Sequence, residues 1–494
     1  MDIQQELDSQ LSPKGRLLTP SHADWTTLSA RWNSCFSVSY AAIVDASCEE
    51  DVAAAIKYAN ANGIPFLAFN GTHGAQLLLN KFKNGIGITT LAMKSMALNE
   101  DDGVKTVWIR GSWLSGHVRD EMHKMGKRST VGTCDSTGLI GPMLGGGHGL
   151  LQGRYGLLTD QIVEMRVVLA DGSIVTVSDR ENNDLFWAMR GTGHNFGIVT
   201  AAKYRVYDVP KEDTWSFGSM VFKGDRLQEL VPAFNQLLKN QTVDVPLWFP
   251  QIMMDPQGNE KAVSRLVLHF APVISSILVL TQAKPIILVK IVYEGSIEAM
   301  RQHFAPLESL KPVTYERKGI TYQTASQALD WHFDSFGNQK NVSVLRFPIG
   351  AESFSYSAMK NTYDRMAAAV IEQPMLGSSF ILWEAYATQA VKAVPDDATA
   401  VADRADDMLV AAIVVLPPGT LPDSPLVKET EKLGQDLREC MVGGEELHAY
   451  VNYAHGDESL EEMYGHQPWR LERLRKLKKQ YDPENRFGFY APIV

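Results

Sequence analysis

The sequence predicts an α+β protein whose amino-terminal part binds a ligand and whose second part is a large antiparallel sheet flanked by helices. The chain of 494 residues is too long for one typical core, since a domain holds about 150 residues. Between residues 39 and 69, a strand, a helix and a second strand end in a glycine turn. From residue 215 to about 447, strand-like runs alternate with helical stretches, as in α+β domains.

The composition indicates a folded protein with a small-molecule partner. Hydrophobic residues make up 45% of the chain and charged residues 21%. The net charge of -10 argues against nucleic-acid binding, which needs a basic surface to neutralise phosphates. The four cysteines are too few for a disulfide scaffold and form no CxxC pair, so no metal site is expected.

The amino terminus, MDIQQELDSQLSPKGR, is polar and lacks the apolar core of a signal peptide, so a cytoplasmic location is expected, with secretion left open. The most apolar region, Val273 to Val292, is interrupted by Lys284, Pro285 and Lys290. We expect two buried strands there, because a membrane span needs about 20 apolar residues in a row. No membrane partner is therefore predicted.

The first part begins with a strand from Ser39 to Ala46, followed by a capping-box spacing from Ser47 to Glu50 that predicts a helix start. Gly63 stands where a left-handed helix end is expected. A second strand from Ile64 to Phe69 ends at the turn Asn70-Gly71-Thr72-His73-Gly74. Open α/β sheets bind ligands at such carboxyl ends, so this turn is the first candidate site.

A second glycine-dense run extends from Gly132 to Gly156. Each glycine loses much backbone entropy on folding. A run so rich in glycine is therefore expected where the chain has to approach a ligand closely. A surface loop is the alternative, but the run is poor in charge and rich in leucine. Around it we expect a strand at 105–111, a helix at 114–125, and a hairpin of 162–169 with 174–177 about Asp171-Gly172.

The second part contains five strand-like runs that predict an antiparallel sheet: Ser264 to Phe270, Ile286 to Tyr293, Val342 to Phe347, Phe380 to Tyr386 and Leu409 to Leu416. A helix is expected from Pro468 to about Gln480.

Four ordered stretches resemble the berberine bridge enzyme-like oxidases of the vanillyl-alcohol oxidase superfamily. They are the turn at 70–74, the segment 132–138 with its following glycines and Arg154 to Leu157, the segment 184–200, and the pair Tyr450 to Tyr453 and Tyr481 to Phe487. The resemblance implies a two-part PCMH-type FAD-binding domain at 37–210 after an arm at 1–36. It also implies a substrate domain at 211–447 and a return to the FAD domain at 448–494.

By this resemblance the cofactor is FAD, bonded to His73 through its 8α carbon and, as a further option, to Cys134 through C6. Glycine turns can offer backbone N–H groups to its pyrophosphate. The expected cofactor-binding residues are His73, Cys134, Phe69, Asn70, Gly71, Thr72, Gly74, Thr133, Thr137, Gly138, Gly141, Gly147, Tyr155, Gly197, Ile198, Val199 and Asn452.

Some positions depart from the family pattern. Phe69 replaces a residue that is often arginine, Thr72 replaces a glycine, and Pro142 stands where relatives carry a histidine. His148 and His194 lie within glycine runs, where loop packing is favoured over a role in the pocket.

The expected catalytic residues are Tyr450, Tyr386 and Glu384. On a strand, Tyr450 and Asn452 would share one face and Tyr453 the other. By resemblance Tyr450 faces the substrate, and Ala412 stands near the position of a catalytic glutamate in the plant enzymes. Glu384 and Tyr386 share a strand face and have supporting roles, although an ordinary ion-paired carboxylate is the alternative for Glu384.

The leading functional hypothesis is an oxidase that transfers hydride from a small organic substrate to FAD, with O₂ as electron acceptor and H₂O₂ as product. The substrate is a secondary metabolite or a sugar. One alternative is a cyclase or isomerase with no net redox turnover, and another is a flavin-binding protein without catalysis.

Overall fold

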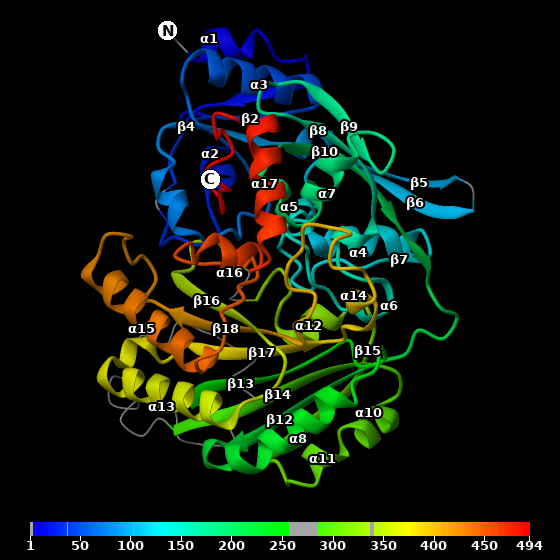
Figure 1. Ribbon diagram of the computed structural model, residues 1–494, viewed down its shortest axis with the longest axis vertical. Helices are drawn as coiled ribbons and strands as arrows, with labels where there is room; N and C mark the ends of the chain where they lie inside the picture. The colour runs from blue at the N-terminus through cyan, green and yellow to red at the C-terminus, as the bar shows by residue number, and fades with distance from the viewer. Residues whose placement is uncertain (1–2, 37, 102, 256–283, 336–339) are drawn as a thin grey trace.

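The computed structural model describes residues 3–36, 38–101, 103–255, 284–335 and 340–494. Figure 1 shows the strands β2, β4, β5, β6, β8, β9 and β10 in the upper half of the molecule and a broad sheet with its helices in the lower half. The carboxyl-terminal helix α17 returns to the upper half. The α+β prediction is confirmed. The expected strand at 264–270 lies outside the described residues.

The first sheet holds the glycine turn at one of its strand ends. Its order is β1-β2-β4-β3, and β4 pairs in parallel with both β2 and β3. The elements are α1 (Ile3–Asp8), β1 (Arg16–Leu18), α2 (Trp25–Ser29), β2 (Tyr40–Asp45), α3 (Glu49–Ala61), β3 (Phe66–Ala68) and β4 (Gly85–Thr89). Because β3 ends at Ala68, Phe69 belongs to the turn rather than to the strand.

Helix α3 covers this sheet with the expected apolar face, since Val52 and Ile56 are fully buried. Its start differs from the prediction, because Cys48 is the N-cap and makes no side-chain cap bond. Ser47 instead donates its backbone N–H to Asp51 Oδ2 at 2.8 Å. Gly63 has a φ of 63°, as expected for the helix end.

A five-stranded sheet with order β5-β6-β10-β8-β9 forms the second half of this part, and all its pairs are antiparallel. The predicted hairpin is its β8–β9 pair. The elements are β5 (Ser95–Asp101), β6 (Val104–Arg110), α4 (Ser115–Lys124), β7 (Lys127–Arg128), α5 (Ile140–Leu144), α6 (Gln152–Tyr155), β8 (Ile162–Val168), β9 (Ile174–Ser178), α7 (Asn183–Thr192), β10 (Ile198–Arg205) and β11 (Tyr207–Asp208).

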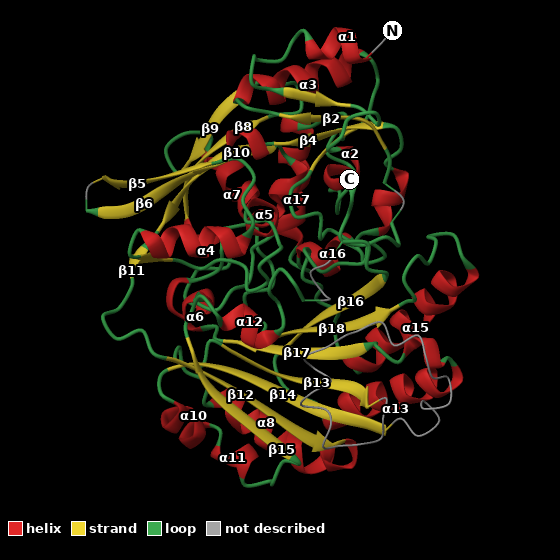
Figure 2. Ribbon diagram, turned by 180° about the vertical axis from the view of Figure 1, so that it is seen from behind, coloured by secondary structure: helices red, strands yellow, loops and turns green. Residues whose placement is uncertain are grey.

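The seven-stranded sheet has the order β15-β12-β14-β13-β17-β18-β16, and every pair is antiparallel. Helices α8, α13 and α15 cover one face, and the other face looks toward the amino-terminal part (Figure 2). The strands are β12 (Trp215–Lys223), β13 (Leu247–Asp255), β14 (Lys284–Glu294), β15 (Thr314–Ile320), β16 (Val344–Ala351), β17 (Phe380–Tyr386) and β18 (Met408–Val415).

The remaining helices surround this sheet or return to the first part. They are α8 (Leu227–Lys239), α10 (Ile297–His303), α11 (Ala305–Glu308), α12 (Ala325–Leu329), α13 (Tyr356–Glu372), α14 (Gln389–Lys392), α15 (Pro425–Val442), α16 (Leu460–Tyr464) and α17 (Pro468–Tyr481). Within the described ranges, no helix combines the length and apolar character needed to cross a bilayer.

Candidate active site

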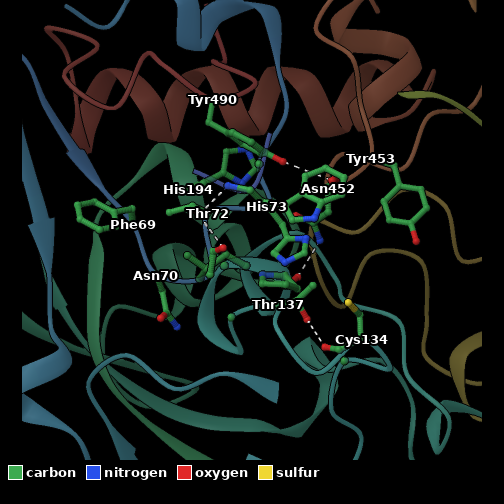
Figure 3. Close-up of a pocket in the computed structure, with 18 of the residues that line it drawn as sticks. Phe69, Asn70, Thr72, His73, Cys134, Thr137, His194, Asn452, Tyr453 and Tyr490 are labelled. Carbon is green, nitrogen blue, oxygen red and sulfur yellow. Dashed lines mark hydrogen bonds between the residues drawn. The ribbon is translucent and has the colours of Figure 1, made fainter. Parts of the chain in front are cut away.

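A cavity of about 470 Å³ lies between the amino-terminal part and the open face of the seven-stranded sheet. Figure 3 shows residues of both glycine-rich segments and of the carboxyl-terminal return around it. Nearly all of the expected site residues line it: Phe69, Asn70, Gly71, Thr72, His73, Gly74, Thr133, Cys134, Thr137, Gly138, Gly141, Gly197, Ile198, Val199, Glu384, Tyr386, Tyr450 and Asn452.

Two expected cofactor residues lie outside the described walls of this cavity. Tyr155 stacks on Tyr207 with ring centroids 3.6 Å apart, so its ring is occupied elsewhere. Gly147 has a φ of 84° and packs against Leu158, whose N–H it accepts at 3.0 Å. Neither residue borders the cavity directly, and their roles in cofactor binding stay predictions.

The two glycine-rich segments meet backbone to backbone. A Cβ on Gly71 would lie 2.6 Å from both the Gly138 nitrogen and the Ser136 oxygen. Asn70 fixes the contact by donating its Nδ2 to the Trp113 carbonyl at 2.7 Å. Because only glycine allows this approach, residues 70–74 and 132–138 form one continuous wall.

Thr72 adopts the left-handed conformation that a glycine would take, with a φ of 60°. Its Oγ1 accepts hydrogen bonds from the Trp32 backbone N–H at 3.1 Å and from Lys340 Nζ. Lys340 also donates to the Gly71 carbonyl at 3.1 Å. These hydrogen bonds offset the strain, which costs of the order of 1 kcal/mol for a residue with a side chain.

His73 and Cys134 approach each other across the wall, joined by one serine. His73 Nε2 lies 2.8 Å from Ser136 Oγ, and Cys134 Sγ lies 3.9 Å from the same oxygen. The imidazole stacks on Trp32 with centroids 4.8 Å apart. Burial, together with the nearby cation of Arg346, lowers the pKa of His73 well below its usual value. His73 is therefore neutral, which is the form that can act as a nucleophile.

The return segment is a turn and not the expected strand. The N–H groups of Tyr453 and Ala454 donate to the Tyr450 carbonyl at 2.8 and 3.0 Å. The turn brings Tyr450, Asn452 and Tyr453 into the same cavity, whereas a strand would have separated Tyr453 from the other two. Asn452 Nδ2 donates to the Tyr450 hydroxyl at 2.7 Å and to the Pro142 carbonyl at 2.9 Å.

Glu384 is a buried carboxylate in the cavity wall, 1% exposed. Tyr453 donates to its Oε2 at 3.2 Å and Tyr386 to its Oε1 at 3.5 Å. Burial raises the pKa of Glu384 to about 7, against the opposing effects of the Tyr453 hydrogen bond and the Arg346 charge. Its hydrogen-bond partners in the described residues are the two tyrosines, and Arg346 acts on it only through its charge, which differs from an ordinary ion-paired carboxylate.

Strand β18 offers no carboxylate to the cavity, and Ala412 faces away from it. Ala412 packs in the core beneath the helices, while Leu409, Ile413 and Val415 line the cavity. The expected alignment was therefore out of register with the cavity face. The neighbouring strand β17 supplies Glu384, which lies opposite Leu409 in the ladder.

The sequence does not predict several of the cavity residues, and its pattern assigns two others to loop packing. Trp32, Arg346 and Tyr490 come from segments without a recognisable motif. His148 and His194 both line the cavity, contrary to the favoured interpretation. Only their place inside glycine runs could have signalled this.

The cavity fits a large ligand with polar groups. His194 Nδ1 is buried without a hydrogen bond inside the described structure, while its Nε2 bonds the Tyr464 hydroxyl at 3.0 Å. Burial lowers the pKa of His194 to about 3, so this nitrogen stays available for a ligand. A Cβ on Gly141 would meet no atom within 4 Å, because this backbone borders open space.

Comparisons with known proteins agree with this geometry. An FAD-binding-domain family model matches residues 40–178, and a "berberine and berberine like" model matches residues 449–493. The chain is 33% identical to the FAD-linked oxidoreductase chyH of Penicillium rubens, over 99% of this chain and 93% of that protein. It is also 33% identical to the FAD-linked oxidoreductase anuG of Penicillium roqueforti, over 100% and 92%.

Solved structures share the fold. The carbohydrate oxidase of Microdochium nivale superposes with a TM-score of 0.79 at 20% identity and covers 100% of this chain and 99% of its own. The glucooligosaccharide oxidase of Acremonium strictum has a TM-score of 0.77 at 19% identity, covers 100% of both chains, and is described with a 6-S-cysteinyl, 8α-N1-histidyl FAD. The chain is thus an enzyme that binds FAD, and it belongs to the FAD-linked oxidoreductases of the berberine bridge type.

Proposed function

We propose that this enzyme oxidises a compact, largely apolar alcohol to a carbonyl compound, with the Tyr453–Glu384 pair as proton acceptor. The observation that carries the proposal is the 3.2 Å hydrogen bond from Tyr453 to Glu384 inside the cavity. A carboxylate whose pKa lies near 7 is well matched to accept a proton at neutral pH.

The proton transfer balances within this pair. As the substrate O–H bond breaks, its proton moves to Tyr453 Oη, and the proton that Tyr453 carried moves to Glu384 Oε2. The carbinol C–H bond breaks with its electron pair, and a C=O double bond forms. Tyr453 alone cannot serve as the base, because burial raises its pKa well above 10 and its hydroxyl therefore keeps its proton. It therefore relays the proton, and Glu384 holds it.

When bound, FAD would supply the hydride acceptor, with O₂ as the proposed final electron acceptor and H₂O₂ as the product. His73 would hold FAD covalently: in the tautomer whose Nε2–H donates to Ser136 Oγ, the lone pair that forms the bond lies on Nδ1. Cys134 is the second attachment point, as the shared contact with Ser136 keeps both side chains at one end of the cavity. The glycine walls at 70–74 and 132–138 hold the remainder.

The sheet-facing wall favours an apolar metabolite over a sugar. Most of the sheet residues that line the cavity are aliphatic or aromatic: Val344, Phe380, Leu382, Leu409, Ile413 and Val415. A sugar would bury several hydroxyl groups against this wall without partners, which costs about 1–3 kcal/mol for each group. The polar groups are concentrated at Arg346, Glu384, Tyr386 and Tyr453, which suits a single reacting hydroxyl.

Anaerobic mixing with candidate alcohols tests the reaction class. We expect apolar allylic or benzylic alcohols to bleach the flavin absorbance and glucose or cellobiose to leave it unchanged. Addition of O₂ should then restore the absorbance and yield one H₂O₂ per turnover. Turnover with a persistently oxidised spectrum would instead establish the cyclase or isomerase alternative. Bound FAD that no substrate reduces would favour a protein without catalysis.

Acid precipitation tests the covalent attachment. We expect the pellet of the wild type to stay yellow, and mass spectrometry to assign the flavin to peptides with His73 and Cys134. Single His73→Ala and Cys134→Ala variants should each retain one bond, and the double variant should release all FAD. A wild-type pellet that loses its colour would contradict the attachment.

A further inference from the structure

Three side chains with metal-ligating atoms gather outside the cavity, where the seven-stranded-sheet region meets the return segment. Glu446 and His448 precede Tyr450 in the chain, and His466 follows helix α16. One ligand atom from each of the three lies within 4.8 Å of the others. Their spacing in the sequence matches no common metal motif, which explains why no metal site was expected.

The hydrogen bonds of His466 determine which of its nitrogens carries a proton. Nε2 lies 3.0 Å from the Leu447 carbonyl, which can only accept, so Nε2 is the donor. In a neutral imidazole, Nδ1 then carries a lone pair. This Nδ1 lies 3.2 Å from Glu446 Oε1, which is also an acceptor.

His448 repeats the arrangement from the other side. Its Nδ1 lies 3.2 Å from Asp406 Oδ1, and its Nε2 lies 3.9 Å from Glu446 Oε2. The Asp406 carboxylate therefore accepts a hydrogen bond from Nδ1–H, and in the neutral form of His448 the lone pair is on Nε2, the nitrogen nearer Glu446. Two imidazole lone pairs and one carboxylate converge, which requires either additional protons on the rings or one cation between them.

We propose that Glu446, His448 and His466 bind a divalent transition-metal ion of the Zn²⁺ type, with solvent as the fourth ligand. Zinc bonds of 2.0–2.1 Å in a tetrahedron place ligand atoms about 3.4 Å apart. His466 Nδ1 and Glu446 Oε1 already have this spacing. His448 has to approach by a side-chain rotation, which its 41% exposed side chain permits.

The outer partners match those of metal-bound histidines. Such histidines donate their second ring N–H to a carboxylate or a backbone carbonyl, which orients the ring. Asp406 and the Leu447 carbonyl fill these two roles. The ion would join the segment before Tyr450 to the segment after α16 and so stabilise the return segment.

Calorimetric titration of the full-length, FAD-loaded protein with ZnCl₂, after removal of metals by a chelator, tests the site. We expect one equivalent to bind and the melting temperature to rise. His448→Ala and His466→Ala should each weaken binding by at least 10-fold, and Asp406→Asn by about 10-fold through the outer partner. Glu445→Gln, one residue from the site, is the matched control and should bind like the wild type.

The proposal fails if the wild type binds no zinc, which would mean that protonated imidazoles pair with Glu446. It also fails if zinc binding survives His466→Ala unchanged, since the ion would then lie elsewhere. FAD content and flavin reduction are measured separately from zinc binding. Absence of the zinc site would therefore not affect the proposed oxidation, and absence of the oxidation would not affect the zinc site.

Discussion

The two walls of the cavity are built in different ways. The amino-terminal wall includes two glycine-rich segments, each continuous in sequence, whose backbones meet closely at Gly71. The opposite wall consists of side chains from β16, β17, β18 and the 450–453 turn, which are far apart in sequence. A wall of backbone suits a cofactor that stays constant, and a wall of side chains suits a substrate that differs among relatives.

The largest effect is expected for Glu384 in the wall formed by the sheet, where a substitution should slow the reaction without changing FAD binding at the glycine-rich wall. Glu384→Gln keeps the side-chain volume but removes the proton acceptor, so flavin reduction should slow by about 10²–10⁴-fold. Bound FAD should be unchanged. In the wild type, the reduction rate should rise with pH through about 7, as Glu384 loses its proton. Stopped-flow absorbance across pH measures both, and a variant with wild-type rates would remove Glu384 from the mechanism.

Acid should lower the free energy of unfolding, because the buried His455 gains a proton when the chain unfolds. This side chain is 1% exposed, both ring nitrogens are buried without hydrogen bonds in the described structure, and burial lowers its pKa to about 4. The unfolded chain binds a proton near pH 6.5, so stability is full above that pH and falls as the pH decreases toward 4. The loss from this group is about 3 kcal/mol.

Denaturant unfolding at pH 7 and pH 4 checks this loss. His455→Leu should reduce the difference in free energy of unfolding between the two pH values by about that amount. His22→Leu, at an exposed position, should leave the difference unchanged. Equal acid losses in both variants would show that His455 does not contribute.

A methyl group on Gly71 should disrupt the backbone wall. Gly71→Ala places Cβ 2.6 Å from backbone atoms of the second glycine-rich segment, and overpacking of this kind costs about 1–3 kcal/mol. FAD content should fall together with stability, as absorbance and thermal melting would reveal. Gly319→Ala, where a Cβ meets nothing within 4 Å, should change neither. Full FAD loading in Gly71→Ala would mean that the two segments are free to separate.

The smallest effect is expected at Thr72. Thr72→Gly relieves the left-handed strain but loses the hydrogen bonds to Trp32 and Lys340, so the free energy of unfolding should change by less than about 1 kcal/mol. Thr72→Val keeps the strain and loses the same bonds, and should cost about 2 kcal/mol. Similar stabilities for the two variants, measured by denaturant unfolding, would show that these bonds contribute little.

The contrast between the walls also explains what the sequence could predict. The turn at 70–74 and the segment at 132–138 bring consecutive residues to the cavity, so their patterns could be recognised directly. Arg346, Glu384 and Tyr453 come together only through strand register and a turn. The local pattern at Tyr450 to Tyr453 allowed a strand, and the Ala412 position depended on a one-residue choice of register, which reverses the face of a strand.

The strict alternation along β17 and β18 has a consequence for how this enzyme family can diversify. Along β18, Leu409, Ile413 and Val415 border the cavity, whereas Met408, Val410, Ala412 and Val414 belong to the helix-covered core. Cavity-facing positions can therefore accumulate replacements while the opposite face keeps the sheet folded. A mutational library restricted to the cavity-facing residues of these strands would therefore sample new substrate specificities at little cost to folding.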